Sequence, residues 1–114
     1  MSAPGLQGLR PWIVQRISAV FIAVLIIYFI IAIALFDQFD YVHWYNWLAW
    51  PGNNIAVALF IVAVLWHAWI GIRDVILDYV QSVVLRMVLF TLVMSVLLGS
   101  GLWGLRALFL VAVK

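Results

Sequence analysis

The chain has 114 residues, of which 69% are hydrophobic and only 9% are charged, and its mean hydropathy is +1.25. Six basic and four acidic side chains cannot cover the surface of a soluble domain of this size, so the composition excludes a soluble globular protein. The small net charge of +2 gives no indication of nucleic-acid binding, and the absence of cysteine excludes disulfides and iron–sulfur ligation by this chain. We therefore predict an integral membrane protein covered by membrane lipid.

Three apolar stretches are each long enough to cross a bilayer as a helix. The hydrocarbon core requires about 20 apolar residues at 1.5 Å per residue. The predicted spans are approximately residues 17–35, 55–76 and 87–105. The sequence therefore predicts an all-α integral membrane fold, with one transmembrane domain of three helices over residues 1–114.

The connection between the first two spans is rich in aromatic residues. In the stretch FDQFDYVHWYNWLAWPGNN, Trp44, Trp47 and Trp50 recur every three residues, and Pro51 follows them. This spacing fits a short helix that lies in the headgroup plane and ends at the proline, because aromatic rings prefer the membrane interface. We predict a short interfacial helix whose main role is anchoring.

The basic residues predict the orientation in the membrane, because cytoplasmic loops retain Lys and Arg. Arg10 and Arg16 precede the first span, whereas the first connection contains Asp37 and Asp40 and no basic residue. The N-terminal segment has the pattern of neither a secretory signal nor an organelle transit peptide, and we interpret it as a retained bacterial N-terminus. We expect a multi-pass protein of the bacterial cytoplasmic (inner) membrane, with the N-terminus cytoplasmic and the C-terminal Lys114 periplasmic.

One histidine, His67, lies within the second predicted span. A ring with two polar nitrogens at this depth must find partners, or its burial costs a few kcal/mol. Two interpretations stay open from burial alone. His67 either bonds to a carbonyl or hydroxyl of a neighbouring helix and is structural, or it belongs to a functional site.

The residues after His67 repeat at helical spacing. His67, Gly71, Asp74 and Asp78 are separated by four, three and four positions, so a continuous helix would present them on one face. Gly71 either opens space beside the histidine for a flat macrocycle or allows close helix packing. In the third span, Gly101 belongs to a run of small residues for which helix packing is the expected role.

Several polar residues near the span ends have both a structural and a chemical interpretation. Arg16 is either a positive-inside anchor or the partner of a carboxylate at shallow depth. Asp78 belongs to a set of balanced charges for which ion pairs or solvation are sufficient explanations. Tyr79 is either an interfacial ring or, as a phenol, a hydrogen-bond donor to a quinone carbonyl.

The segment HAWIGIRDVILDYV, from His67 to Val80, resembles the second-helix motif of the D-type membrane-anchor subunits of succinate dehydrogenase, respiratory complex II. The resemblance extends to the three-span plan, the aromatic connection, the position of Arg16 and the following VVLR. It implies a hydrophobic anchor that is not catalytic alone. Its expected role is in a succinate:ubiquinone oxidoreductase of the respiratory chain and the tricarboxylic acid cycle.

The resemblance also implies roles for four residues. His67 would be an axial ligand of the iron of a b-type heme, and Arg16 would approach a heme propionate. Tyr79 would hydrogen-bond ubiquinone, with Asp78 beside the same site. It gives no role to Arg73 or Asp74.

The implied partners are the other subunits of the complex. The second axial ligand would come from a C-type cytochrome b anchor subunit, so that the two anchors share the heme. FAD and the iron–sulfur clusters would belong to the flavoprotein and iron–sulfur subunits. Two alternatives remain at this stage: a heme-free structural anchor in which a neighbouring helix satisfies His67, and a fumarate reductase anchor, which can lack heme and use another quinone.

Overall fold

The computed structural model describes residues 4–113, with the side chains of residue 10 and residues 12–113. Its helices, in chain order, are α1 (Pro4–Ala34), α2 (Tyr41–Ala49), α3 (Pro51–Tyr79) and α4 (Val83–Ala112). α1, α3 and α4 each contain a stretch long and apolar enough to cross a membrane. The predicted all-α architecture, with three long helices and a short aromatic helix between the first two, is confirmed.

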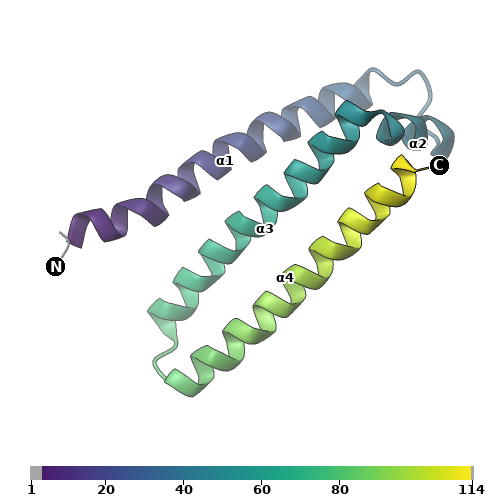
Figure 1. Ribbon diagram of the computed structural model, residues 1–114. Helices are drawn as coiled ribbons and strands as arrows, with labels where there is room; N and C mark the ends of the chain where they lie inside the picture. The colour runs from purple at the N-terminus through teal and green to yellow at the C-terminus, as the bar shows by residue number, and fades with distance from the viewer. Residues whose placement is uncertain (1–3, 114) are drawn as a thin grey trace.

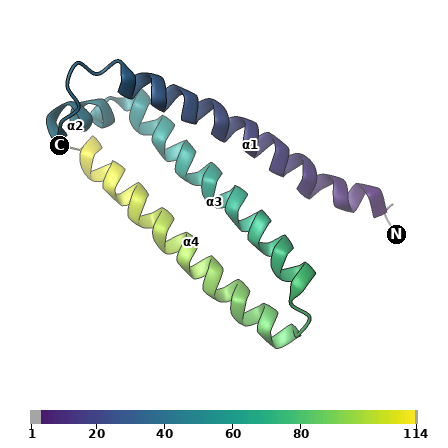
Figure 2. The same ribbon diagram turned by 180° about the vertical axis from the view of Figure 1, so that it is seen from behind.

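The three long helices form a row with α3 in the centre (Figure 1). α3 packs against α1 on one side and α4 on the other, and among the described residues no Cα atom of α1 comes within 8 Å of α4. The view from behind shows the same order, with α2 lying across the ends of α3 and α4 (Figure 2). We call this end of the molecule the α2 end, and the opposite end, where residues 80–82 join α3 to α4, the turn end.

Each long helix is longer than the span predicted for it, and α1 ends one residue before the predicted end of its span. α3 has 29 residues, which corresponds to about 44 Å, whereas the hydrocarbon core of a bilayer is about 30 Å thick. At the α2 end, Trp50 separates α2 from α3, and Pro51 is the first residue of α3, where its missing N–H has no cost. The proline therefore ends the short helix, as predicted, and also begins the next one. Lys114, expected on the periplasmic side, lies outside the described residues.

Very little of the chain is buried within the chain itself. Among the described residues, the buried large hydrophobic side chains are Ile70, Ile76 and Leu108. Most other large apolar side chains of the three long helices are exposed, including Trp103 at 75%. Since backbone polar groups are satisfied inside the helices, these apolar faces are suited to lipid or to partner helices. The chain is thus a multi-pass membrane protein.

Side-chain hydrogen bonds from Asn53 join α1 and α2 to the start of α3. Its Oδ1 atom accepts a hydrogen bond from the hydroxyl of Tyr28 on α1, and its Nδ2 atom donates to the carbonyl of Trp47 on α2 at 3.0 Å. Asn53 is also the buried polar residue of the described chain, with 9% of its surface exposed. Because it is paired on both sides of its amide, its burial is compensated.

The neighbouring Asn54 connects the other two elements at this end. Its Nδ2 atom donates to the carbonyl of Leu48 on α2 and to that of Leu108 on α4, both at 3.0 Å. Two successive asparagines thus hold all four helices together at the α2 end.

The first residue before α2 is Asp40, which caps the helix. Its carboxylate accepts hydrogen bonds from the backbone N–H of His43 at 2.9 Å and from the His43 ring at 2.6 Å. An N-cap carboxylate stabilises the first turn because the N–H groups there lack partners within the helix. These two bonds, the backbone one first, hold the pKa of Asp40 below its ordinary value.

Glycines on α4 allow α3 and α4 to approach closely. A Cβ atom at Gly101 would clash with a methyl carbon of Leu65, and one at Gly104 would lie 3.1 Å from Ile61. A Cβ atom at Gly99 would meet nothing within 4 Å. The predicted packing role of the small residues in the third span is therefore confirmed for two of these glycines.

Candidate functional site

The sequence-predicted site begins with His67, which lies on α3 in the seam with α1. The Nδ1 atom of its ring is 2.9 Å from the hydroxyl oxygen of Ser18 on α1. The same hydroxyl donates a hydrogen bond to the backbone carbonyl of Gln15, one turn earlier, at 3.0 Å. The partner foreseen in the structural interpretation of His67, a hydroxyl of a neighbouring helix, is therefore present.

This bond satisfies only one of the two ring nitrogens. The hydroxyl of Ser18 is placed to donate its one proton to Gln15, which leaves its oxygen able to accept a hydrogen bond from Nδ1 of His67. In a neutral ring, a proton on Nδ1 leaves the lone pair on Nε2. Among the described residues, Nε2 of His67 has no hydrogen-bond partner. A neutral imidazole with an open Nε2 is the form that binds metal ions.

The face of α3 that carries His67 continues as a regular helix to Tyr79. The predicted alignment of His67, Gly71, Asp74 and Asp78 on one face therefore holds. A Cβ atom at Gly71 would lie 3.4 Å from Nε2 of Gln15, so the side chain of Gln15 lies against the glycine. This contact agrees with close helix packing, one of the two interpretations of Gly71.

An apolar groove runs along the α1–α3 seam next to Ser18. Its volume is about 380 Å³. It is lined by Val14, Ile17, Ser18, Phe21, Leu59, Val62, Ala63 and Trp66. His67 is not among these lining residues. One imidazole from one of two chains is the donor that a b-type heme requires, so the chemistry of His67 itself fits one side of such a group.

Among the described residues, His67 is the histidine of the long helices. The other histidine, His43, is on α2 at the α2 end, whereas His67 lies about 24 Å along α3 from Pro51, the first residue of that helix. Among the described residues, no group of three or more His, Cys, Asp or Glu side chains could hold a metal ion. A six-coordinate iron at His67 would therefore need its second ligand from another chain.

The structure does not bring Arg16 into contact with His67. Arg16 and Ser18 are two positions apart on α1, which corresponds to about 200° around a helix. The Arg16 guanidinium lies 5.2 Å from the centre of the Trp12 ring on an exposed face. Within the described part of the chain, no carboxylate lies within ion-pair distance of Arg16.

Asp78 and Tyr79 form the last turn of α3, at the turn end. Both are exposed, Tyr79 at 81%, and neither contacts His67, which is about 18 Å away along the helix axis. An exposed phenol at a helix end is accessible to a ligand that a second chain or the membrane supplies.

The other charged residues at the turn end have different partners. Arg73 pairs with the adjacent Asp74 at 3.2 Å, as the expected balance of charges suggests. Arg86 instead donates to the backbone carbonyls of Leu77 and Val80. In the described residues, the buried atoms Nε of Arg73 and Oε1 of Gln15 have no hydrogen-bond partner.

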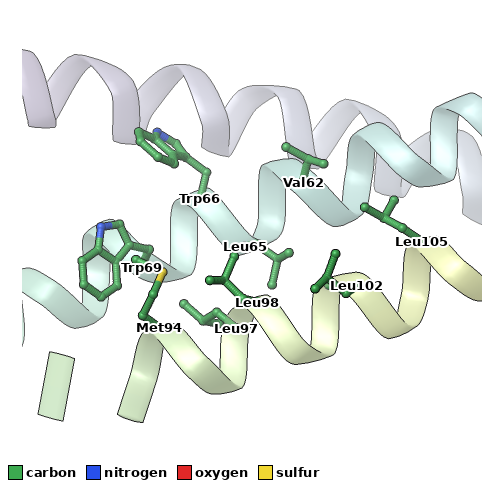
Figure 3. Close-up of a pocket in the computed structure, with 10 residues that line it drawn as sticks. Val62, Leu65, Trp66, Trp69, Met94, Leu97, Leu98, Leu102 and Leu105 are labelled. Carbon is green, nitrogen blue, oxygen red and sulfur yellow. The ribbon is translucent and has the colours of Figure 1, made fainter. Parts of the chain in front are cut away.

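A second groove lies between α3 and α4 and is about 370 Å³ in volume. Figure 3 shows its walls, with Leu65, Trp66 and Trp69 from α3 and Met94 and the other leucines from α4. All ten lining residues are apolar. The polar groups of these side chains are the indole N–H groups of Trp66 and Trp69, so the groove suits a lipid chain or an apolar side chain of another helix better than a headgroup.

Reasoning from the sequence missed Ser18 and Gln15. Both are polar residues three positions apart on α1, which places them on one face, and both meet the face of α3 that carries His67. This spacing was the available signal. It identifies a polar face of α1 but not the residues of α3 that this face contacts.

Comparisons with known proteins agree with these features. Residues 7–102 match the family described as the succinate dehydrogenase/fumarate reductase transmembrane subunit. The chain is also similar to the succinate dehydrogenase hydrophobic membrane anchor subunit of Coxiella burnetii, with 31% identity over 104 residues. That alignment covers 91% of this chain and 90% of the relative.

Proposed function

The chain belongs to the succinate dehydrogenase/fumarate reductase transmembrane subunit family and is a membrane anchor, and from this membership we propose its specific role. It is the D-type anchor of a succinate:ubiquinone oxidoreductase. It shares a b-type heme with a C-type cytochrome b anchor subunit and contributes to the ubiquinone-reduction site. It docks the flavoprotein and iron–sulfur subunits, which carry FAD and the iron–sulfur clusters, at the bacterial cytoplasmic membrane.

The observation that carries this proposal is the state of His67. Its Nδ1 atom lies 2.9 Å from the hydroxyl oxygen of Ser18, and Nε2 has no hydrogen-bond partner among the described residues. His67 would bind the heme iron through Nε2. A bound b-type heme supplies a one-electron redox centre at this position.

Arg16 would bind a heme propionate. Its guanidinium is exposed over the Trp12 ring and has no carboxylate partner among the described residues, so it is available for a charge-assisted bond to a second chain's cofactor. Its position away from the seam is compatible with a heme that lies between two subunits.

Tyr79 and Asp78 would serve the quinone at the turn end. The Tyr79 hydroxyl would donate a hydrogen bond to a quinone carbonyl oxygen. Asp78, which is also exposed, would accept a proton from water and pass it toward the quinone, since reduction to the quinol consumes two electrons and two protons.

The charges support a cytoplasmic turn end. Arg73 and Arg86 lie at this end, together with Arg10 and Arg16 in the first turns of α1, whereas Asp37 and Asp40 lie at the α2 end. By the positive-inside rule, the turn end and the N-terminus would face the cytoplasm and the C-terminus the periplasm.

The test is a reduced-minus-oxidised optical spectrum of the complex that co-purifies with this chain from its native membrane. The proposal expects a b-type heme signal together with flavin and iron–sulfur subunits. His67→Ala should abolish the signal, whereas His43→Ala, at the far end of the molecule, should leave it unchanged. An intact complex without heme would contradict the heme role and favour a heme-free structural anchor.

The direction of the reaction needs a separate assay, because the matching family includes fumarate reductases. The purified complex should reduce ubiquinone with succinate faster than it reduces fumarate with a low-potential quinol. The reverse ratio would identify a fumarate reductase anchor.

A further inference from the structure

The hydroxyl of Ser18 contacts His67 from a different helix, and we propose that it is a positioning residue for the metal ligand. Ser18 fixes His67 as the tautomer with its proton on Nδ1 and so presents the lone pair of Nε2 for binding to iron. This inference rests on the proposed function, because it concerns the heme ligand named there.

The hydrogen-bond chain has a defined direction. Ser18 donates to the carbonyl of Gln15 within α1, which leaves its oxygen as an acceptor for Nδ1 of His67 on α3. An acceptor at Nδ1 makes the tautomer with a proton on Nε2 unfavourable, because Nδ1 would then be an acceptor facing an acceptor. The backbone of α1 therefore determines which nitrogen of His67 is open.

The type of acceptor sets the expected effect on the iron. A hydrogen bond from Nδ1 raises the basicity of an imidazole ligand, which stabilises the ferric form relative to the ferrous form. The nearest carboxylate on this face of α3, that of Asp74, is two turns away and pairs with Arg73. Ser18 is thus the acceptor that tunes His67, and its loss should raise the midpoint potential of the heme.

The contacts between α1 and α3 also make the hydrogen bond to His67 depend on the position of α1 along α3. One turn from the Ser18 contact, the side chain of Gln15 lies against Gly71. These two contacts fix the register of α1 on α3 at the level of His67. A shift of α1 by one residue would remove the acceptor from Nδ1.

The experiment compares Ser18→Ala and Ser18→Thr with the unmodified protein in the full native complex, and uses Ser100→Ala, at an exposed position on α4, as the matched control. Three quantities are measured: the heme-to-flavin ratio, the electron paramagnetic resonance g values of the ferric heme, and its midpoint potential. Ser18→Ala should lower heme retention about tenfold, move the g values and shift the potential of the remaining heme upward. Ser18→Thr keeps a hydroxyl and should restore all three.

The outcomes separate this inference from the proposed function. A complex with full heme, unchanged g values and unchanged potential in Ser18→Ala would overturn the role of Ser18 alone. Equal heme loss in Ser18→Ala and Ser18→Thr would also overturn it, because the hydroxyl would then not be the cause. An unmodified complex that contains no heme would overturn the proposed heme role, and this inference with it.

Discussion

The guanidinium of Arg86, in the first turn of α4, donates a 2.9 Å hydrogen bond to the backbone carbonyl of Leu77 in the last turn of α3. Its Nε atom donates a second bond of 2.5 Å to the carbonyl of Val80, just beyond that helix. The last carbonyls of a helix have no partner within it and carry the negative end of its dipole. Arg86 thus closes α3 next to the residue proposed to bind quinone, Tyr79.

Replacing this arginine should loosen the end of α3. We expect Arg86→Gln to destabilise the complex by about 1–2 kcal/mol, because it removes a cation and its hydrogen bonds from a helix C-terminus. Quinone reduction should also slow, because the hydrogen bonds from Arg86 would no longer hold the backbone on either side of Tyr79 in place. Thermal unfolding of the complex and steady-state quinone reduction measure the two effects. Arg106→Gln, an exposed position elsewhere on α4, is the control, and equal unfolding temperatures for the two variants would refute the capping role.

The hydroxyl of Tyr79 can be tested separately from its position. Tyr79→Phe should lower kcat/KM for ubiquinone by about 2- to 10-fold, the value of one neutral hydrogen bond, because only the donor is lost. Heme content should stay constant, since Tyr79 is about 18 Å along α3 from His67. Tyr41→Phe, equally exposed but at the α2 end, should change neither quantity. Unchanged quinone kinetics in Tyr79→Phe would remove this residue from the site.

The sequence was sufficient to predict the long helices but not their ends. The uncharged run of residues 17–35 defines a span because the bilayer requires about 20 apolar residues. Asn53 and Asn54 follow Pro51-Gly52 and resemble a loop by composition. In the structure they belong to the first turn of α3, where contacts with three other helices compensate their polarity.

The candidate site was predictable only in part. His67 stands out because an imidazole in an apolar span is rare, and its face follows from helical spacing. Ser18 does not stand out, because hydroxyl residues are common in membrane helices and can bond to their own backbone. Its contact with His67 depends on the register between α1 and α3, which no local pattern in either helix specifies.

The close approach of α3 and α4 gives a matched pair of glycine substitutions. Alanine at position 101 or 99 gains the same helix propensity, so the difference between them isolates the contact with Leu65. We expect Gly101→Ala to be less stable than Gly99→Ala by about 1–3 kcal/mol, the usual effect of overpacking. Thermal unfolding in detergent measures it. Equal stability would mean that Leu65 moves into the neighbouring groove without cost.

The side-chain amide of Asn54 should contribute to the stability of the chain, because it donates hydrogen bonds to two carbonyls on different helices. Asn54→Ala should destabilise the chain by about 1 kcal/mol, since interhelical hydrogen bonds in membranes average about 0.6 kcal/mol each. Unfolding of the purified complex in a denaturing detergent measures this loss. Asn46→Ala, on the exposed side of α2, is the control and should have no effect. Equal unfolding of Asn54→Ala and Asn46→Ala at the same fraction of denaturing detergent would contradict this role of Asn54. The α2 end would then be held by contacts of the exposed apolar faces of α1 and α4 with lipid and partner helices.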